Sequence, residues 1–297
     1  MMMVNTRILT QEFDYFVPKT IRETVELLNQ YGQEAKIIAG GTDLLVQLKQ
    51  EKISPSYLIN IMKISELSYI KEDGGLRIGS GTKLREVVEF CAKDEKYAAL
   101  YEALRSLGKA QVLNMGTIGG NLCNGSPSAD AAPPLLVFDS RVKICSDQEE
   151  KIFDLEEFFK GVNITAMASN ELMTEIHIPP IKNGMGSAFM KVARVGADIS
   201  KITCAVAVER HRDICASCRI ALGAVAPVPM RAKAAERTLQ GNKVDEPLIE
   251  KTGQRVAEEI KPIDDVRSTA EYRRHLSTIL FKDVFWKAWR RAGGGEG

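Results

Sequence analysis

The residues best suited to ligand chemistry lie in two glycine-rich segments. The first, Gly40-Gly41-Thr42-Asp43, follows a short apolar stretch and precedes a leucine-rich run that begins at Leu44. Two glycines let a backbone approach a ligand closely, and free N–H groups at the start of a helix attract an anion. Thr42 and Asp43 are also good helix N-cap residues. Taken alone, this segment is therefore explained more simply as a tight strand-to-helix turn that binds nothing.

The second segment is Gly116-Thr117-Ile118-Gly119-Gly120-Asn121, which continues through Ser126 and Ser128 to Asp130. Its hydroxyls, amides and carboxylate are the hydrogen-bond partners that a polyol and a diphosphate need. The alternative is a glycine-rich surface Ω-loop without a ligand. Two glycine-pair loops in one α/β domain favour a diphosphate ligand more than either loop does alone.

Other familiar motifs are incomplete. Gly79-Ser80-Gly81-Thr82 begins like a dinucleotide-binding GxGxxG motif but lacks the third glycine. The sequence contains no P-loop, serine hydrolase elbow or HExxH motif. Cys215 and Cys218 form a CxxC pair within a strand pattern, where residues three apart point to opposite faces, so we do not expect them to share a metal. We predict no catalytic residue and no metal site in this chain.

Composition limits the class of protein. The chain has 297 residues, 44% hydrophobic and 27% charged, with 40 basic and 39 acidic residues for a net charge of +1. This balance gives no general attraction to nucleic acid or an anionic membrane. The longest apolar runs are far below the ~20 residues that a membrane helix needs, and the N-terminus lacks the apolar region of a secretory signal. Six scattered cysteines indicate reduced thiols in a cytoplasmic protein, and three histidines make a redox metal centre improbable.

The first half must position both glycine segments, and its pattern alternates between helices and strands. Thr20 and Glu23 form a capping box, and Gly32 ends the helix that they begin. Thr82 is expected to cap another helix, and residues 108–128 are expected to form a long ordered loop. The elements that we predict here are helices at 20–32, 44 onward, 82–90 and 97–107, and strands at 36–39, 57–61, 76–78, 141–145 and 172–178.

Pro179-Pro180 and Lys182-Asn183-Gly184 mark the best candidate domain boundary. Beyond it, strand patterns cover 187–192, 199–208 and 213–223, and helical patterns cover 230–240, 246–260 and 270–292. Strands followed by a run of helices indicate an α+β domain. We therefore predict an N-terminal domain at 1–180, a C-terminal domain at 181–292 and a disordered tail at 293–297.

The two glycine segments resemble a known family. Ile38-Ala39-Gly40-Gly41-Thr42-Asp43-Leu44 and Thr117-Ile118-Gly119-Gly120-Asn121, with Ser126 to Asp130 behind them, are similar to the FAD-binding (medium) subunit of the molybdenum hydroxylases. The resemblance covers nearly the whole chain and extends to residues 189–194, 221–227 and 271–276. Residues 123–125 and 226–229 resemble the bacterial xanthine dehydrogenase FAD subunit most.

The resemblance implies an α+β fold. It consists of a vanillyl-alcohol-oxidase-type FAD-binding domain of two α/β subdomains, followed by a small domain with a three-stranded antiparallel sheet and helices. FAD would bind non-covalently with its diphosphate on the two glycine loops, its ribityl hydroxyls on Asp130 and its flavin near the backbone of Met173. The implied cofactor-binding residues are Lys36, Ile37, Ile38, Ala39, Gly40, Gly41, Thr42, Asp43, Leu44, Gly108, Thr117, Gly119, Gly120, Asn121, Asp130, Met173 and Lys191.

One of these positions departs from the pattern of the family. Many relatives carry a lysine directly after the phenylalanine that corresponds to Phe189, but this chain has Met190 there and Lys191 one residue later. Adjacent strand residues face opposite ways, so whether Lys191 reaches the flavin stays open.

The resemblance also implies a function. The chain would be the FAD-binding electron-transfer subunit of a heterotrimeric, xanthine-dehydrogenase-type molybdenum hydroxylase. It would receive electrons from a [2Fe–2S] small subunit, reduced in turn by a molybdopterin large subunit, and pass them from FAD to NAD. Two alternatives stay open, namely a self-contained flavin oxidase and a non-catalytic nucleotide-binding assembly subunit. The sequence does not identify the heterocycle or exclude an acceptor other than NAD.

Overall fold

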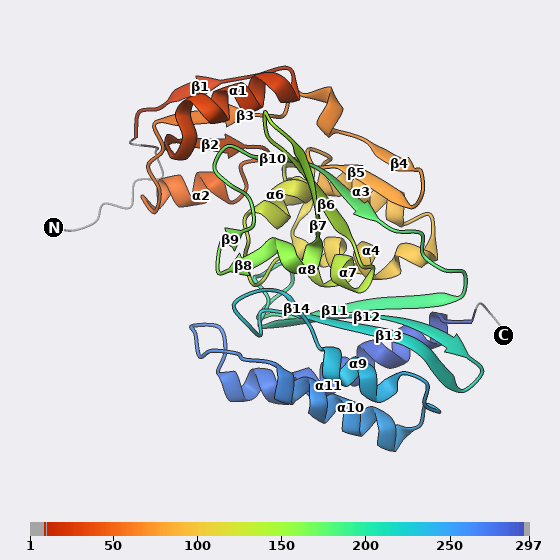
Figure 1. Ribbon diagram of the computed structural model, residues 1–297. Coiled ribbons are helices and arrows are strands. Elements are labelled where there is room, and N and C mark those ends of the chain that lie inside the picture. The colour runs from red at the N-terminus through yellow and green to blue at the C-terminus, as the bar shows by residue number, and fades with distance from the viewer. Residues whose placement is uncertain (1–8, 10, 294–297) are drawn as a thin grey trace.

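The computed structural model describes residue 9 and residues 11–293 (Figure 1). The helices are α1 (Ile21–Tyr31), α2 (Leu44–Lys49), α3 (Leu84–Cys91), α4 (Ala98–Leu107), α5 (Ala110–Met115), α6 (Ile118–Cys123), α7 (Ala132–Val137), α8 (Leu155–Phe158), α9 (Lys233–Leu239), α10 (Glu246–Glu259) and α11 (Ala270–Arg291). The strands are β1 (Asp14–Phe16), β2 (Ala35–Ile38), β3 (Tyr57–Asn60), β4 (Ile70–Glu72), β5 (Leu76–Gly79), β6 (Arg141–Cys145), β7 (Glu150–Asp154), β8 (Phe159–Gly161), β9 (Ile164–Thr165), β10 (Leu172–Ile178), β11 (Met185–Val192), β12 (Ile202–His211), β13 (Ile214–Gly223) and β14 (Met230–Arg231).

The first sheet is small and parallel, with the strand order β1-β3-β2. Its helix α1 begins at the predicted Thr20 cap, because the Thr20 hydroxyl accepts a hydrogen bond from the Glu23 N–H at 3.1 Å. The Glu23 carboxylate accepts from the Lys19 N–H at 2.8 Å rather than from the Thr20 N–H of a full capping box. The helix ends at Gly32, whose φ of +53° favours glycine. The chain leaves β2 directly into the first glycine segment, so this sheet determines where that segment lies.

The second sheet has the order β4-β5-β10-β6-β7 and its pairs are antiparallel. Gly74 and Gly75 have positive φ values and form the turn of the β4–β5 hairpin. The central strand β10 is almost entirely buried, because it lies between β5 and β6 and its side chains belong to one core with residues of α3, α4, α6 and α7. This core fixes α6, which carries the second glycine pair.

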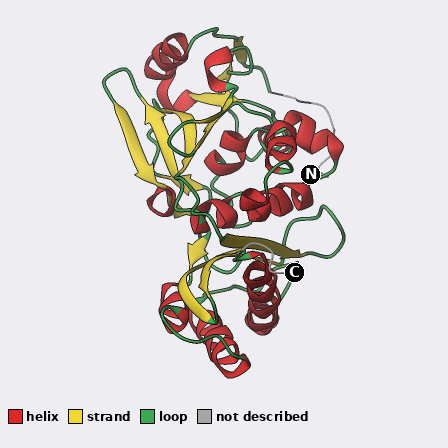
Figure 2. Cartoon of the chain, turned by 90° about the vertical axis from the view of Figure 1, so that its right-hand side faces the viewer, coloured by secondary structure: helices red, strands yellow, loops and turns green. Residues whose placement is uncertain are grey.

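The C-terminal sheet is antiparallel and buried on both faces, which explains the uninterrupted apolar run of β12 (Figures 1 and 2). Cys204, Val206 and Val208 pack in one core with the helices α10 and α11. Ala205 and Ala207 point the other way, into the core of the N-terminal half. Because successive strand residues point to opposite faces, this one sheet contributes side chains to two hydrophobic cores. The three predicted strands are present, and the two-residue strand β14 adds a fourth.

Three local predictions are wrong. Residues 108–128 do not form one long loop, because α5 and α6 lie within them. Thr82 does not cap α3, and its side chain instead exchanges hydrogen bonds with the backbone of Tyr69. A β-bulge opposite Glu209 and Arg210 shifts the register of β13, so that Cys215 and Cys218 are both buried on the same side rather than on opposite faces.

The tail lies mostly outside the described residues. Gly293, the first residue of the predicted disordered tail, donates a hydrogen bond to the Gly184 carbonyl at 3.0 Å. Residues 294–297 are not described.

Candidate functional site

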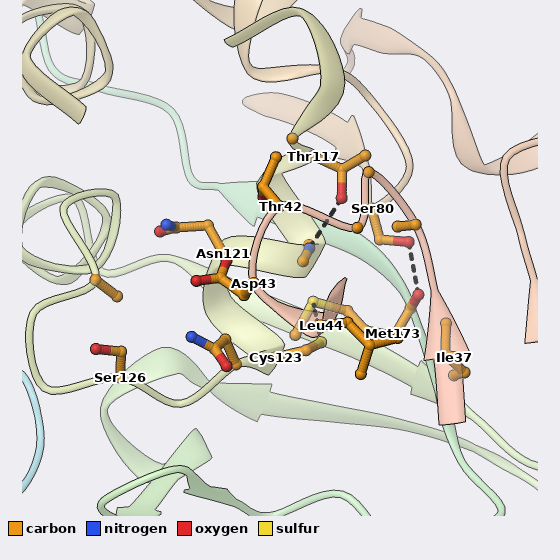
Figure 3. A pocket seen from close by; sticks show the side chains of 18 of the residues that line it. Ile37, Thr42, Asp43, Leu44, Ser80, Thr117, Asn121, Cys123, Ser126 and Met173 are labelled. Atoms are coloured by element: carbon orange, nitrogen blue, oxygen red, sulfur yellow. Dashed lines mark hydrogen bonds between the residues drawn. The ribbon is translucent and has the colours of Figure 1, made fainter. Parts of the chain in front are cut away.

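A cavity of about 560 Å³ lies between the first sheet and the α6–β10 region (Figure 3). It has the size of a small-molecule or cofactor site. Both glycine segments line it, although they are far apart in the sequence. The predicted residues that line it are Lys36, Ile37, Ala39, Gly40, Gly41, Thr42, Asp43, Leu44, Thr117, Gly119, Gly120, Asn121, Asp130 and Met173.

The first glycine segment presents unused backbone donors to this cavity. None of the hydrogen bonds formed among the described residues is donated by the backbone N–H of Gly41, Thr42 or Asp43. Gly41 has a φ of +70°, which favours glycine. A side chain at Gly40 would overlap the Met115 carbonyl, so this glycine lets the segment pack against the end of α5. The segment is thus a backbone cradle suited to an anion.

The second glycine segment differs, because its N–H groups bond within the protein. Gly119 N–H donates to the Ser80 carbonyl at 2.9 Å. Gly120 N–H donates to the Thr117 hydroxyl at 3.0 Å, which is the dashed line at Thr117 in Figure 3. A Cβ at Gly119 would lie 2.6 Å from the Ser80 Cβ. Gly119 therefore packs α6 against the end of β5, and the free donors for an anion lie on the first segment.

Ser80 joins the second segment to the cavity floor. Its hydroxyl donates a hydrogen bond to the Met173 carbonyl at 2.6 Å. This bond uses a backbone group of Met173 that we expected to face a ligand. Beside it, the Cys123 sulfur lies 3.7 Å from the Met167 sulfur and 3.8 Å from the Met173 sulfur (Figure 3). Burial raises the pKa of the Cys123 thiol to about 12, so this thiol stays protonated and unreactive at neutral pH. The floor of the cavity is thus apolar and polarizable.

Asp130 supplies a buried carboxylate to the cavity wall. Its Oδ2 accepts a hydrogen bond from Lys191 Nζ at 2.7 Å. Its Oδ1 is buried and has no hydrogen-bond partner among the described residues. Burial raises the pKa of Asp130 to about 6, although the neighbouring Lys191 lowers it. At neutral pH the group is therefore mainly ionised and has one unused acceptor oxygen.

Three predicted site residues do not line the cavity. Ile38 points into a small core with Leu48 and Leu58. Gly108 follows α4 and packs close to Val112. Lys191 contacts Asp130 rather than the cavity itself.

Other lining residues were not among the predictions. They include Gln47, Ser80, Cys123, Asn124, Thr165, Met167, Glu171 and Ile199. The Gly79-Ser80-Gly81 sequence was the one signal for Ser80, because paired glycines mark a close backbone approach. The others depend on how distant segments fold together.

The described residues contain no group of three or more His, Cys, Asp or Glu side chains placed to hold a metal ion. None of the helices in the described ranges combines the length and the apolar sequence that crossing a bilayer requires.

Known proteins match this chain along almost its whole length. The family model for the FAD binding domain in molybdopterin dehydrogenase matches residues 11–181, and that for the CO dehydrogenase flavoprotein C-terminal domain matches residues 187–288. The xanthine dehydrogenase FAD-binding subunit of Escherichia coli O157:H7 is 34% identical over 284 residues, covering 94% of this chain and 97% of that protein. The carbon monoxide dehydrogenase medium chain of Hydrogenophaga pseudoflava is 30% identical over 94% of this chain and 98% of its own length.

Solved structures agree with these matches. A carbon monoxide dehydrogenase structure from Hydrogenophaga pseudoflava superimposes with a TM-score of 0.93 at 30% identity, covering 96% of this chain and 100% of that one. Quinoline 2-oxidoreductase from Pseudomonas putida 86 superimposes with a TM-score of 0.86 at 26% identity, over 94% and 97% of the two chains. With both family models and full-length relatives in agreement, this chain belongs to the FAD-binding medium subunits of the molybdenum hydroxylases, which are oxidoreductase subunits that act within multi-subunit dehydrogenases.

Proposed function

We propose that this chain is the FAD-binding electron-transfer subunit of a xanthine-dehydrogenase-type molybdenum hydroxylase. The observation that carries the proposal is the cavity, which combines free backbone donors, an ionised carboxylate and an apolar floor in a chain with a full-length xanthine dehydrogenase relative. Diphosphate, polyol and flavin ring are three of the chemical parts of FAD, and these surfaces have the chemistry that the three parts need.

Named residues would hold each part of the cofactor. The free N–H groups of Gly41, Thr42 and Asp43 would bind the diphosphate, with the Thr117–Asn121 segment on the other side. Asp130 would accept hydrogen bonds from the ribityl hydroxyls. Cys123 and Met173 would lie beneath the flavin, and the chain would hold it without a covalent bond because the Cys123 thiol is protonated.

FAD supplies one- and two-electron redox chemistry when bound. In the proposed complex, a [2Fe–2S] small subunit delivers electrons that a molybdopterin large subunit has taken from a heterocycle, and NAD accepts them. The task of this chain is to hold the flavin between the partner cluster and the NAD site. The cysteines that the structure describes are free thiols, which fits the reducing cytoplasm as the place of assembly.

Reconstitution of the purified chain with FAD tests the proposal. We expect a yellow protein with a flavin absorption spectrum, whose bound flavin is bleached anaerobically by NADH without any heterocycle present. A control with bovine serum albumin measures non-specific flavin retention. Protein that retains no more FAD than this control would favour the assembly-subunit alternative. Flavin that is bleached by a heterocycle in the absence of partner subunits would favour the oxidase alternative.

A further inference from the structure

The strand β11 of the C-terminal sheet docks along α4 of the N-terminal half. Alternate residues of the strand make the contacts, since they share one face. On the helix, the contacted positions recur every three to four residues, which also places them on one face. The contacts are Ser187 Oγ with Ala99 N–H at 3.2 Å, Phe189 N–H with Glu102 Oε2 at 2.9 Å, and Lys191 Nζ with the Ser106 carbonyl at 3.2 Å.

This docking determines where Lys191 points. Its side chain is only 6% exposed, and its ammonium group lies between the Ser106 carbonyl and the Asp130 carboxylate, which is 7% exposed. Met190, the next residue along the strand, faces the opposite core with the C-terminal helices. The alternation of the strand therefore directs Lys191 to the cavity wall and Met190 away from it.

We infer that Lys191 is a positioning residue for the cofactor, which keeps Asp130 ionised and fixes its Oδ2 so that Oδ1 stays available as an acceptor. This inference rests on the proposed function, in which Asp130 binds the ribityl hydroxyls of FAD. It makes the C-terminal half a participant in cofactor binding, although Lys191 itself does not line the cavity.

The surroundings of Asp130 make Lys191 decisive for its charge. Burial raises the pKa of Asp130 to about 6, and the attraction and hydrogen bond of Lys191 are what oppose this rise. Among the described residues, Lys191 provides the ion pair of Asp130. From α4, Glu102 faces Phe189 and is paired with Arg291 and Lys287 of α11. The other ionisable residues that line the cavity are Lys36, Asp43, Cys123, Glu171 and Asp198.

The test measures the dissociation constant of FAD between pH 5.5 and 8.5 by quenching of flavin fluorescence. Wild-type affinity should be constant above about pH 7 and weaken below pH 6, as Asp130 becomes protonated. Lys191→Met should weaken binding about tenfold at pH 7.5, because a charge-assisted hydrogen bond becomes a neutral one. Its affinity should recover at a higher pH than that of wild type. Lys191→Arg keeps the charge and should retain most of the affinity.

Control variants separate this role from a structural one. Lys182→Met removes an exposed lysine of the same half and should leave the profile unchanged. Asp130→Asn should abolish the pH dependence, and adding Lys191→Met to it should have no further effect on that dependence. Lys191→Gln keeps a donor without a charge and provides a second test if Lys191→Met does not fold.

Each contrary result has a distinct meaning. A Lys191→Met or Lys191→Gln protein with the wild-type profile would overturn the inference, and so would an equal loss of affinity at every pH, which would indicate a structural role only. Wild-type affinity in Asp130→Ala would instead contradict the proposed FAD contact on which the inference rests.

Discussion

At the residue scale, Asp130 carries the most specific prediction, because its Oδ1 is a buried acceptor without a partner in the described structure. Charge-assisted hydrogen bonds are worth roughly 1.5–3 kcal/mol. We therefore expect Asp130→Ala to weaken FAD binding at least about tenfold, measured by fluorescence titration at pH 7.5. Asp147→Ala, an exposed aspartate in the β6–β7 turn, serves as the control. An unchanged dissociation constant for Asp130→Ala would exclude the contact.

Gly41 and Gly120 allow a second test at this scale. Gly41 has a φ of +70°, and a Cβ on Gly120 would lie 2.9 Å from the Thr117 hydroxyl that caps α6. Gly41→Ala and Gly120→Ala should both purify with a reduced FAD content, because the backbone that faces the diphosphate must shift. Gly241→Ala is matched to Gly41→Ala, since its φ is +77° and nothing lies within 4 Å of its Cβ. A full complement of FAD in the two site variants would show that the diphosphate assignment is wrong.

At the element scale, local patterns predicted the elements that local interactions stabilise. The Thr20 cap of α1 is confirmed, although the Glu23 carboxylate accepts from the Lys19 N–H rather than from that of Thr20. The predicted strand 141–145 corresponds to β6 residue for residue. The helix α6 was missed, because Gly119 and Gly120 are poor helix formers and its stability comes from burying Ile118 and Leu122 in a distant core. The glycine segments are local patterns and could be found from the sequence. The Lys191–Asp130 pair could not, because its two residues come from different halves of the fold.

The packing of α6 yields a stability prediction. A Cβ at Gly119 would lie 2.6 Å from both the Cβ and the carbonyl oxygen of Ser80, so Gly119→Ala must displace α6 from the end of β5. Overpacking of this kind costs typically about 1–3 kcal/mol of unfolding free energy. Gly161→Ala is the control, because the nearest atom to its Cβ would be a side-chain carbon at 3.6 Å. Urea unfolding of the FAD-free proteins measures the difference. Equal stability of the Gly119→Ala and wild-type proteins would contradict this packing role.

At the scale of the whole molecule, Glu102 joins the two halves. Burial would raise the pKa of Glu102, but Arg291, the Phe189 N–H and Lys287 hold it below its ordinary value. A lowered pKa adds stability above the ordinary pKa of the carboxyl group, and this stability is lost as the pH falls through the lowered value. Glu102→Gln should thus cost about 1.5–3 kcal/mol at pH 7 and less at pH 3.5, measured by urea unfolding. Glu89→Gln, from an exposed pair, should cost under about 1 kcal/mol. A pH-independent loss in Glu102→Gln would contradict this assignment.

The last prediction concerns partnership. A cofactor that exchanges electrons with another chain must lie near that chain, so part of this surface should form an obligate, fairly apolar interface. The net charge of +1 provides no general electrostatic attraction, and exposed apolar side chains such as Val46, Met115 and Ile199 are available for contact.

We expect the isolated chain to bind FAD and to show no turnover with hypoxanthine or another heterocycle. Adding the iron–sulfur and molybdopterin subunits should restore turnover, with flavin reduction following addition of the heterocycle. In the same assay, Asp130→Ala should assemble with both partners and yet transfer fewer electrons to NAD, because it loses FAD rather than the interface. Heterocycle oxidation by the lone polypeptide would contradict the electron-transfer role and support a flavin oxidase.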